Sequence, residues 1–102
     1  MPNLFYAMEK ITNSMSTLAT SPGRIKERLR SAFLELHLIS DDIPASLQAD
    51  YQWIIQELTK APDQGQGSVV ATLEEMSEDH AVEIAKRIDT LAFQVFERYF
   101  RT

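Results

Sequence analysis

Residues 77–100 read SEDHAVEIAKRIDTLAFQVFERYF, and this stretch decides the fold class. Apolar side chains recur in it every three or four residues, which is the spacing of one face of an α-helix. Ser77 is suited to cap the helix, because its hydroxyl can accept a hydrogen bond from a free N–H group of the first turn. Glu78 and Asp79 follow where the helix dipole favours negative charge. The stretch therefore predicts a long amphipathic helix, whose main stripe is Ala81, Ile84, Ala85, Ile88, Leu91, Ala92, Val95 and Tyr99.

A second seam runs beside the main stripe of the same helix. It consists of Val82, Asp89, Phe93, Phe96 and Phe100. The two sets together cover roughly 200° of the helix circumference, so the helix is either wrapped on both sides by its own bundle or covered by another chain. Three Phe residues spaced three and four apart would leave a patch that a monomer rarely exposes. We therefore expect this seam to form a two-fold dimer interface, in which Asp89 sets the register or forms an ion pair.

Helical spacing continues through the rest of the chain, and no segment shows the sustained alternation of a β-strand. Helices are expected over residues 1–20, 22–39 and 44–60, with a short helix after the loop 61–67. At 102 residues the chain is long enough for one hydrophobic core and too short for two. The sequence thus predicts an all-α fold, a compact bundle of four main helices plus one short helix, in a single domain over residues 1–102.

Helix starts are marked by capping residues. Ser21 and Pro22 are expected to begin the second helix as its N-cap and first residue, because proline at that position loses no hydrogen bond. Ser68 or Thr72 is expected to cap the short helix, and Thr72 to Glu75 has the form of a capping box.

The first helix, within residues 1–20, has an unusual polar surface. Outside its apolar stripe it carries mostly neutral side chains, where a solvated helix usually carries charges. Such a surface can be covered by a partner. We therefore expect this helix to be peripheral to the bundle or part of an oligomer interface. The neutral residues are Asn3, Thr12, Asn13, Ser14, Ser16, Thr17 and Thr20.

Four of the chain's ten basic residues lie within residues 21–30. At about 100° per residue, Arg24 and Arg28 share one edge of the polar face of the second helix, and Lys26 and Arg30 share the other. This two-edged arrangement is typical of a solvated helix rather than of one binding stripe. We expect the cluster to lie on the surface and to be matched by carboxylates.

Two binding alternatives use the same cluster. Ser21, Arg24 and Arg28 could hold a phosphate together with the free N–H groups of the first helical turn. The whole cluster could instead bind nucleic acid, but the net charge of −5 opposes that affinity, which comes mainly from cations on phosphates. We therefore do not expect a nucleic-acid partner.

Glu74, Glu75 and Glu78 have the EExxE spacing, and over these five residues the chain resembles all-helical nucleotide pyrophosphohydrolases. The resemblance implies a metal-dependent hydrolase in which these carboxylates hold Mg²⁺. That family needs a second acidic pair on a following helix, whereas Lys86 and Asp89 stand at the corresponding spacing here. Ser77, as a helix cap, would also divide the three carboxylates between two elements. We therefore expect no enzyme, no bound metal and no cofactor.

Trp53 falls away from the apolar stripe of the third helix. The stripe is set by Ile54 and Leu58, and Trp53 lies on another edge at about 100° per residue. A tryptophan in that position either covers a neighbouring helix or anchors an interface. We include it among the expected interface residues.

The composition limits the remaining classes of protein. The chain has no Cys, which excludes disulfides and thiolate metal sites and fits a reducing compartment. No apolar run approaches the eighteen or so residues of a membrane span. The sequence therefore indicates a small non-enzymatic interaction protein of the cytoplasm. We expect it to self-associate as a homodimer and to have no membrane partner, and a further protein partner is possible.

Overall fold

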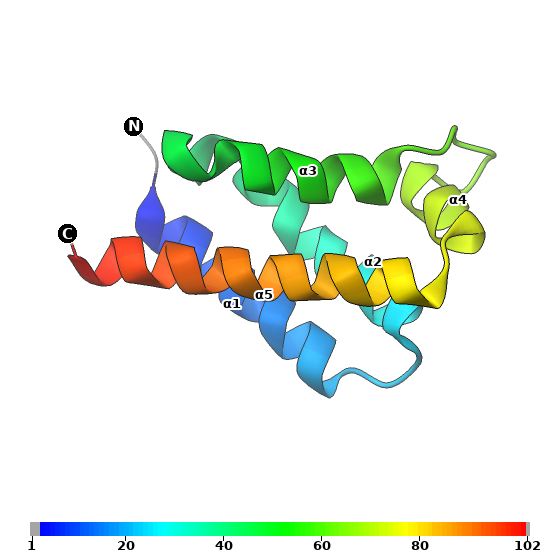
Figure 1. Ribbon diagram of the computed structural model, residues 1–102, viewed down its shortest axis with the longest axis horizontal. Coiled ribbons are helices and arrows are strands. Elements are labelled where there is room, and N and C mark those ends of the chain that lie inside the picture. Colours follow the sequence, from blue (N-terminus) through cyan, green and yellow to red (C-terminus); the bar gives the residue numbers. More distant parts are fainter. Residues whose placement is uncertain (1–2, 102) are drawn as a thin grey trace.

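The computed structural model describes residues 3–101, in which five α-helices are joined by short connections (Figure 1). No strand occurs in this range, so the predicted all-α bundle of four main helices and one short helix is confirmed. The Cα radius of gyration is 13.3 Å, which matches the value of about 13 Å for a compact domain of 100 residues. The elements are α1 (Leu4–Thr20), α2 (Ile25–Leu36), the 3₁₀ helices η1 (His37–Asp42) and η2 (Ala45–Leu47), α3 (Gln48–Thr59), α4 (Ser68–Glu75) and α5 (Glu78–Arg101).

The longest helix, α5, runs the length of the molecule and touches α1, α2 and α3 (Figure 1). α1 packs against α2 and α5, so it contributes to the core of its own chain. The short α4 lies against α3 and α2 at the end of the bundle opposite the two termini. The first residues of α1 and the last residues of α5 therefore meet at one end.

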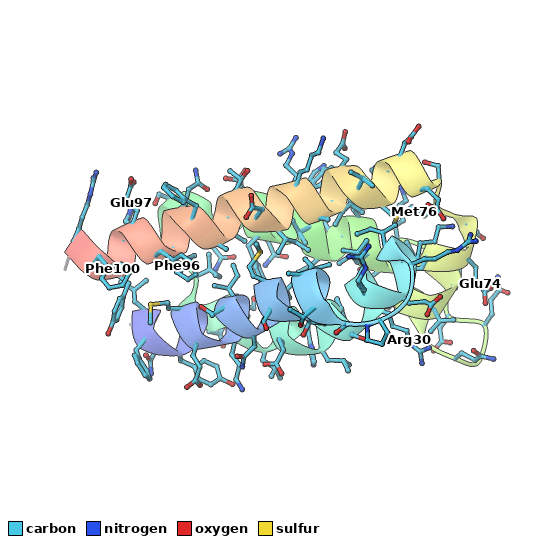
Figure 2. All side chains as sticks on the ribbon, turned by 90° about the horizontal axis from the view of Figure 1, so that it is seen from below. Arg30, Glu74, Met76, Phe96, Glu97 and Phe100 are labelled. Atoms are coloured by element: carbon cyan, nitrogen blue, oxygen red, sulfur yellow. The ribbon has the colours of Figure 1, made fainter. Side chains whose placement is uncertain are left out.

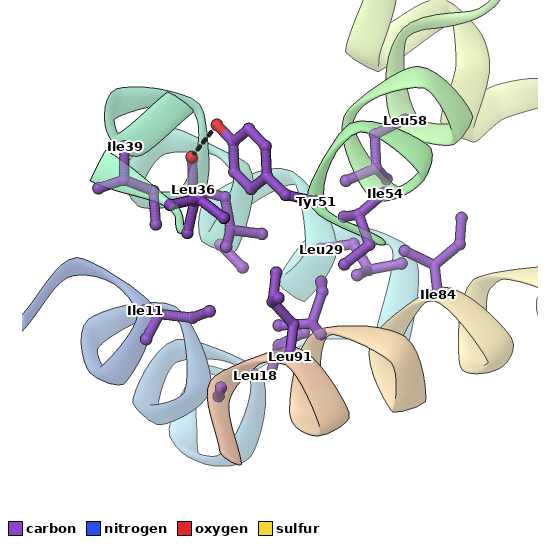
Figure 3. Packing of buried hydrophobic residues seen from close by; sticks show 14 of the residues in the cluster. Ile11, Leu18, Leu29, Leu36, Ile39, Tyr51, Ile54, Leu58, Ile84 and Leu91 are labelled. Atoms are coloured by element: carbon purple, nitrogen blue, oxygen red, sulfur yellow. Dashed lines mark hydrogen bonds between the residues drawn. The ribbon is translucent and has the colours of Figure 1, made fainter. Parts of the chain in front are cut away.

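The core forms where the apolar stripes of these helices meet (Figure 3). Six of the eight residues of the main stripe of α5 are buried as expected, with Ile84, Ile88, Leu91 and Val95 inaccessible to solvent, whereas Ala85 and Tyr99 are half-buried. The largest side chain in the core belongs to Tyr51, whose hydroxyl donates a hydrogen bond to the backbone oxygen of Leu36 (2.7 Å). Burial raises the pKa of this phenol to about 12, and the negative charge of Asp41 adds to the effect.

The predicted start of the second helix is wrong. Ser21 donates its backbone N–H to Thr17 and closes α1, and α2 begins only at Ile25 with Arg24 as the N-cap residue. Between them Gly23 has φ +100°, a conformation that favours glycine over every other residue. This turn separates the two helices and removes Ser21 from the N-terminus of α2.

Two more predicted boundaries differ from the structure. The second helix ends as α-helix at Leu36 and continues as η1, and the third is divided into η2 and α3. Both predicted caps of the short helix are wrong: Ser68 is the first residue of α4 and follows the N-cap Gly67, and Thr72 lies inside the helix and is buried. Its hydroxyl donates to the backbone oxygen of Ser68 (2.6 Å) and accepts from the N–H of Ala61 (2.9 Å).

The cap of the last helix is confirmed. The Ser77 hydroxyl accepts a hydrogen bond from the N–H of His80 (3.1 Å), and α5 begins at the next residue, Glu78. Over residues 3–101, no helix combines the length and the apolar character that crossing a membrane requires.

Candidate functional site

The bundle leaves four of the five residues of the second seam of α5 exposed. Phe93 is 69% exposed, Phe100 is 76% exposed and Val82 is 41% exposed. Phe96 is half-buried against the core, and Asp89 is exposed. At about 100° per residue these five side chains fall within about 60° of one another, so they form one stripe along α5.

A groove between α1 and α5 lies beside this stripe. It has a volume of about 380 Å³. Figure 2 looks onto these two helices, with Phe96 and Phe100 on the edge of α5 nearest α1 and Glu97 on the opposite edge. The walls of the groove are small or apolar side chains, apart from one carboxylate. They come from Thr12, Met15, Ser16 and Ala19 of α1 and from Asp89, Ala92, Phe93 and Phe96 of α5.

Aromatic side chains gather at the end of the groove where the termini meet. Phe5 of α1 is 56% exposed, and its ring centroid lies 6.2 Å from that of Tyr99. The Tyr99 ring lies 5.2 Å from that of Phe100, in an edge-to-face arrangement. We call the whole exposed surface the α1/α5 face. It comprises Phe5, Thr12, Met15, Ser16 and Ala19 of α1 and Val82, Asp89, Phe93, Phe96 and Phe100 of α5.

The neutral residues of α1 are divided between the core and the surface. Ser14 is buried, and its hydroxyl lies within hydrogen-bond distance of the backbone oxygens of Lys10 (3.1 Å) and Ala32 (3.2 Å). On the α1/α5 face, the Thr12 hydroxyl donates to the backbone oxygen of Met8 (2.6 Å). Because this donor is satisfied inside its own helix, Thr12 can be covered by apolar groups at little cost.

Asp89 is the one charged member of the α1/α5 face. Among residues 3–101 it belongs to none of the ion pairs. Its side chain lines the groove between α1 and α5. Covering this carboxylate without a cation would be costly, because a buried charge needs a partner.

Trp53 lies on the other side of α5, between α3 and α5. It is half-buried and packs on the core. The Arg87 guanidinium lies 4.6 Å from the centre of its ring, and the His80 ring approaches edge-on at 6.2 Å. Trp53 therefore covers a helix contact of its own chain, which is the first of the two roles that its position in the sequence allowed.

A polar cluster next to Trp53 joins α3 to α5. His80 Nε2 lies 2.7 Å from Glu57 Oε1, and Lys60 Nζ lies 3.2 Å from the same oxygen. Burial alone would raise the pKa of the Glu57 carboxyl, but the hydrogen bonds and charges of His80 and Lys60 outweigh it and hold the pKa below its usual value. Sequence reasoning missed this pair, because its members lie 23 residues apart.

The residues of the proposed phosphate site do not come together. Arg28 is half-buried, and its Nη1 donates to the backbone oxygen of Leu18 (2.8 Å) near the end of α1. Arg24 instead lies 3.8 Å from Glu78, with both side chains mostly exposed. Ser21 is bonded to α1 rather than placed at the start of α2.

The other two basic residues of the cluster, Lys26 and Arg30, line an open groove of about 370 Å³ between α2 and α4. Its apolar floor is Val70 and Leu73. Three basic residues and three carboxylates surround this floor, so the groove has no charge preference for an anion. The residues are Arg24, Lys26 and Arg30 and Glu27, Glu74 and Glu78.

The three carboxylates of the EExxE spacing lie on two elements. Glu74 and Glu75 end α4, Glu78 begins α5, and all three are exposed. In the described part of the chain, no group of three or more His, Cys, Asp or Glu residues is close enough to hold a metal ion. The positions of these three carboxylates therefore give no support to the metal site that the five-residue resemblance implies.

No family model matches this chain, and no curated protein or solved structure matches it at a significant level. The α1/α5 face is therefore interpreted from its own geometry and chemistry.

Proposed function

We propose that this chain is a non-enzymatic interaction protein that self-associates through the α1/α5 face. The observation that carries the proposal is the exposure of Phe93 and Phe100, on a surface whose one charged member is Asp89. A cytoplasmic location, which the absence of Cys fits, is part of the same proposal.

The exposed aromatic area is of the size that an interface needs. Phe5, Phe93 and Phe100 together expose about two complete phenylalanine side chains, or roughly 300–500 Å² at about 150–250 Å² each. A standard interface buries about 800 Å² per partner, of which a little more than half is apolar. These three rings therefore supply most of the apolar area that one partner contributes.

A second copy of the chain fits this face better than a partner of opposite charge. The face offers almost no charge for an oppositely charged partner to recognise, and Asp89 alone interrupts it. It also combines protruding rings with a groove, as a self-complementary surface must when the same patch serves both sides of a two-fold axis. Burying the rings of both copies then removes the apolar surface from water.

The test is the mass in solution of the wild-type chain and of two matched variants, measured by light scattering over a range of concentrations. We expect the wild type to be a dimer and Phe93→Glu to be a folded monomer. Leu34→Glu is the control, because Leu34 is similarly exposed (63%) but lies on α2, outside the face. We expect this variant to remain a dimer.

Circular dichroism of both variants separates loss of association from loss of folding. A wild-type chain that stays monomeric at the highest concentration would contradict the proposal. A dimer that Leu34→Glu breaks and Phe93→Glu leaves intact would move the interface to α2.

A further inference from the structure

Four of the five residues of the α5 stripe, all except Val82, have a spacing that reads the same in both directions. Asp89, Phe93, Phe96 and Phe100 are separated by four, three and four residues. An antiparallel copy of α5, centred between Gln94 and Val95, therefore places every one of these side chains opposite another member of the set. The same heptad-like spacing is what lets two helices pack side by side along a seam.

Taking self-association through the α1/α5 face as given, we infer that the two copies pack with their α5 helices antiparallel. Phe93 of each copy then faces Phe96 of the other. Phe100 of each copy enters the groove of the other, next to Asp89.

Size favours this direction. The face has an aromatic end, with Phe5 and Phe100, and an end of small side chains, with Ser16 and Ala19. Antiparallel packing sets the large side chains of one copy against the small ones of the other, which is how well-packed layers interdigitate. The groove of about 380 Å³ has room for a phenyl ring, since a cavity of about 150 Å³ already holds benzene. Parallel packing would set the two Phe100 rings against each other and leave both grooves empty.

Charge favours the same direction. Arg101 follows Phe100, so the antiparallel arrangement brings it within about one residue of the partner's Asp89. Its guanidinium is mostly exposed, and its contact with Glu97 is long, at 3.7 Å. Arg101 is thus free to turn toward the partner's carboxylate as that group becomes covered. A parallel arrangement would instead bring the two Asp89 carboxylates together. Their negative charges would repel each other where the interface excludes water.

The arrangement is tested by spin-label distances on two single-cysteine variants, Lys86→Cys and Glu97→Cys. The chain has no Cys of its own, and both positions are exposed. At a rise of about 1.5 Å per residue, the antiparallel dimer separates the two Lys86 positions by about 25 Å along the helix axis and the two Glu97 positions by only about 8 Å.

We therefore expect a distance that is clearly shorter at position 97 than at position 86. Equal distances at both positions, in a chain of dimeric mass, would overturn the antiparallel arrangement and leave self-association standing. Monomeric mass without any dipolar signal would overturn self-association, and this inference with it.

Charge reversal tests the contact between Asp89 and Arg101 separately. Asp89→Arg and Arg101→Asp should each weaken the dimer by about tenfold, because each sets like charges together at two symmetric positions. The double variant restores the pairing and should return the dissociation constant to near the wild-type value. Additive weakening in the double variant would show that these two residues do not meet across the interface.

Discussion

Aromatic side chains outside the core stripes lie on both flanks of α5, and the bundle covers them differently: Trp53 of α3 lies on one flank, and Phe93 and Phe100 of α5 itself lie on the other. On the flank toward α3, Trp53 is covered by Arg87 and the edge of His80. On the flank toward α1, Phe93 and Phe100 stand in solvent beside an open groove. An aromatic residue away from the core stripe is therefore no evidence of an interface until its neighbours are known. Long charged side chains can cover one ring within the chain, while another ring stays uncovered.

The largest expected difference separates the buried stripe of α5 from its seam. Leu91→Ala should lower the free energy of unfolding of the monomer by about 2–5 kcal/mol, because it leaves a cavity in the core. Phe93→Ala should change it by less than about 0.5 kcal/mol, because that ring touches mainly water. Urea unfolding at a concentration where the chain is monomeric measures both. A large loss in Phe93→Ala would mean that the seam belongs to the core.

Trp53 should contribute to the stability of the monomer rather than to association. Trp53→Ala should lower the free energy of unfolding by about 1–3 kcal/mol, less than for a fully buried ring, since Trp53 is half-buried. The mass measured by light scattering should stay that of the wild type. If Trp53→Ala breaks the dimer as Phe93→Glu is expected to do, then both flanks of α5 take part in the interface.

The contact between Glu57 and His80 gives the α3 flank a pH dependence. The pKa of the Glu57 carboxyl is lower in the folded chain than its usual value of 4.5, so the unfolded chain takes up a proton first as the pH falls. The stabilisation is complete above pH 4.5 and is lost as the pH falls through the pKa of the folded state.

Urea midpoints of the wild type and of Glu57→Gln should therefore differ near neutral pH and converge in acid. Glu9→Gln is the control, because it removes an exposed carboxylate of α1 that belongs to no ion pair among residues 3–101. A constant difference between wild type and Glu57→Gln at every pH would contradict the mechanism.

The smallest effect is expected at the ion pair between Arg24 and Glu78. Both side chains are mostly exposed and lie 3.8 Å apart, so Arg24→Ala should change the free energy of unfolding by less than about 0.5 kcal/mol. Arg28→Ala is the comparison within the same cluster. It should cost more, because it frees the backbone oxygen of Leu18 at a partly buried position. Equal effects would mean that the helix connection does not depend on the Arg28 contact.

Local pattern was sufficient for most of the fold. The period of the apolar residues predicted the five α-helices and most of the buried stripe of α5, and the residue types at 77–79 predicted the cap at Ser77. It was insufficient for the start of α2, because Ser21 followed by Pro22 is a strong start signal that the left-handed turn at Gly23 overrides. Glycine can adopt a positive φ but does not have to, so the left-handed conformation of Gly23 could not be predicted from the neighbouring residues.

The candidate site was predicted only in part. The α5 seam could be recognised because its residues share one helix and a regular spacing. The α1 half of the groove could not, since the approach of α1 to α5 depends on how the helices pack. The pairing of Glu57 with His80 was equally out of reach, at a separation of 23 residues.

The sequence by itself determined which segments are helical and which face of each helix is apolar, because both follow from side chains within one or two turns of each other. Only the tertiary structure decided which excess side chains would be covered. The positions of separate helices decide whether Arg87 contacts Trp53 and whether Phe93 stays exposed to solvent beside α1. The relative positions of the helices depend on how side chains from all of them pack together in the core, so the sequence of one segment does not determine them.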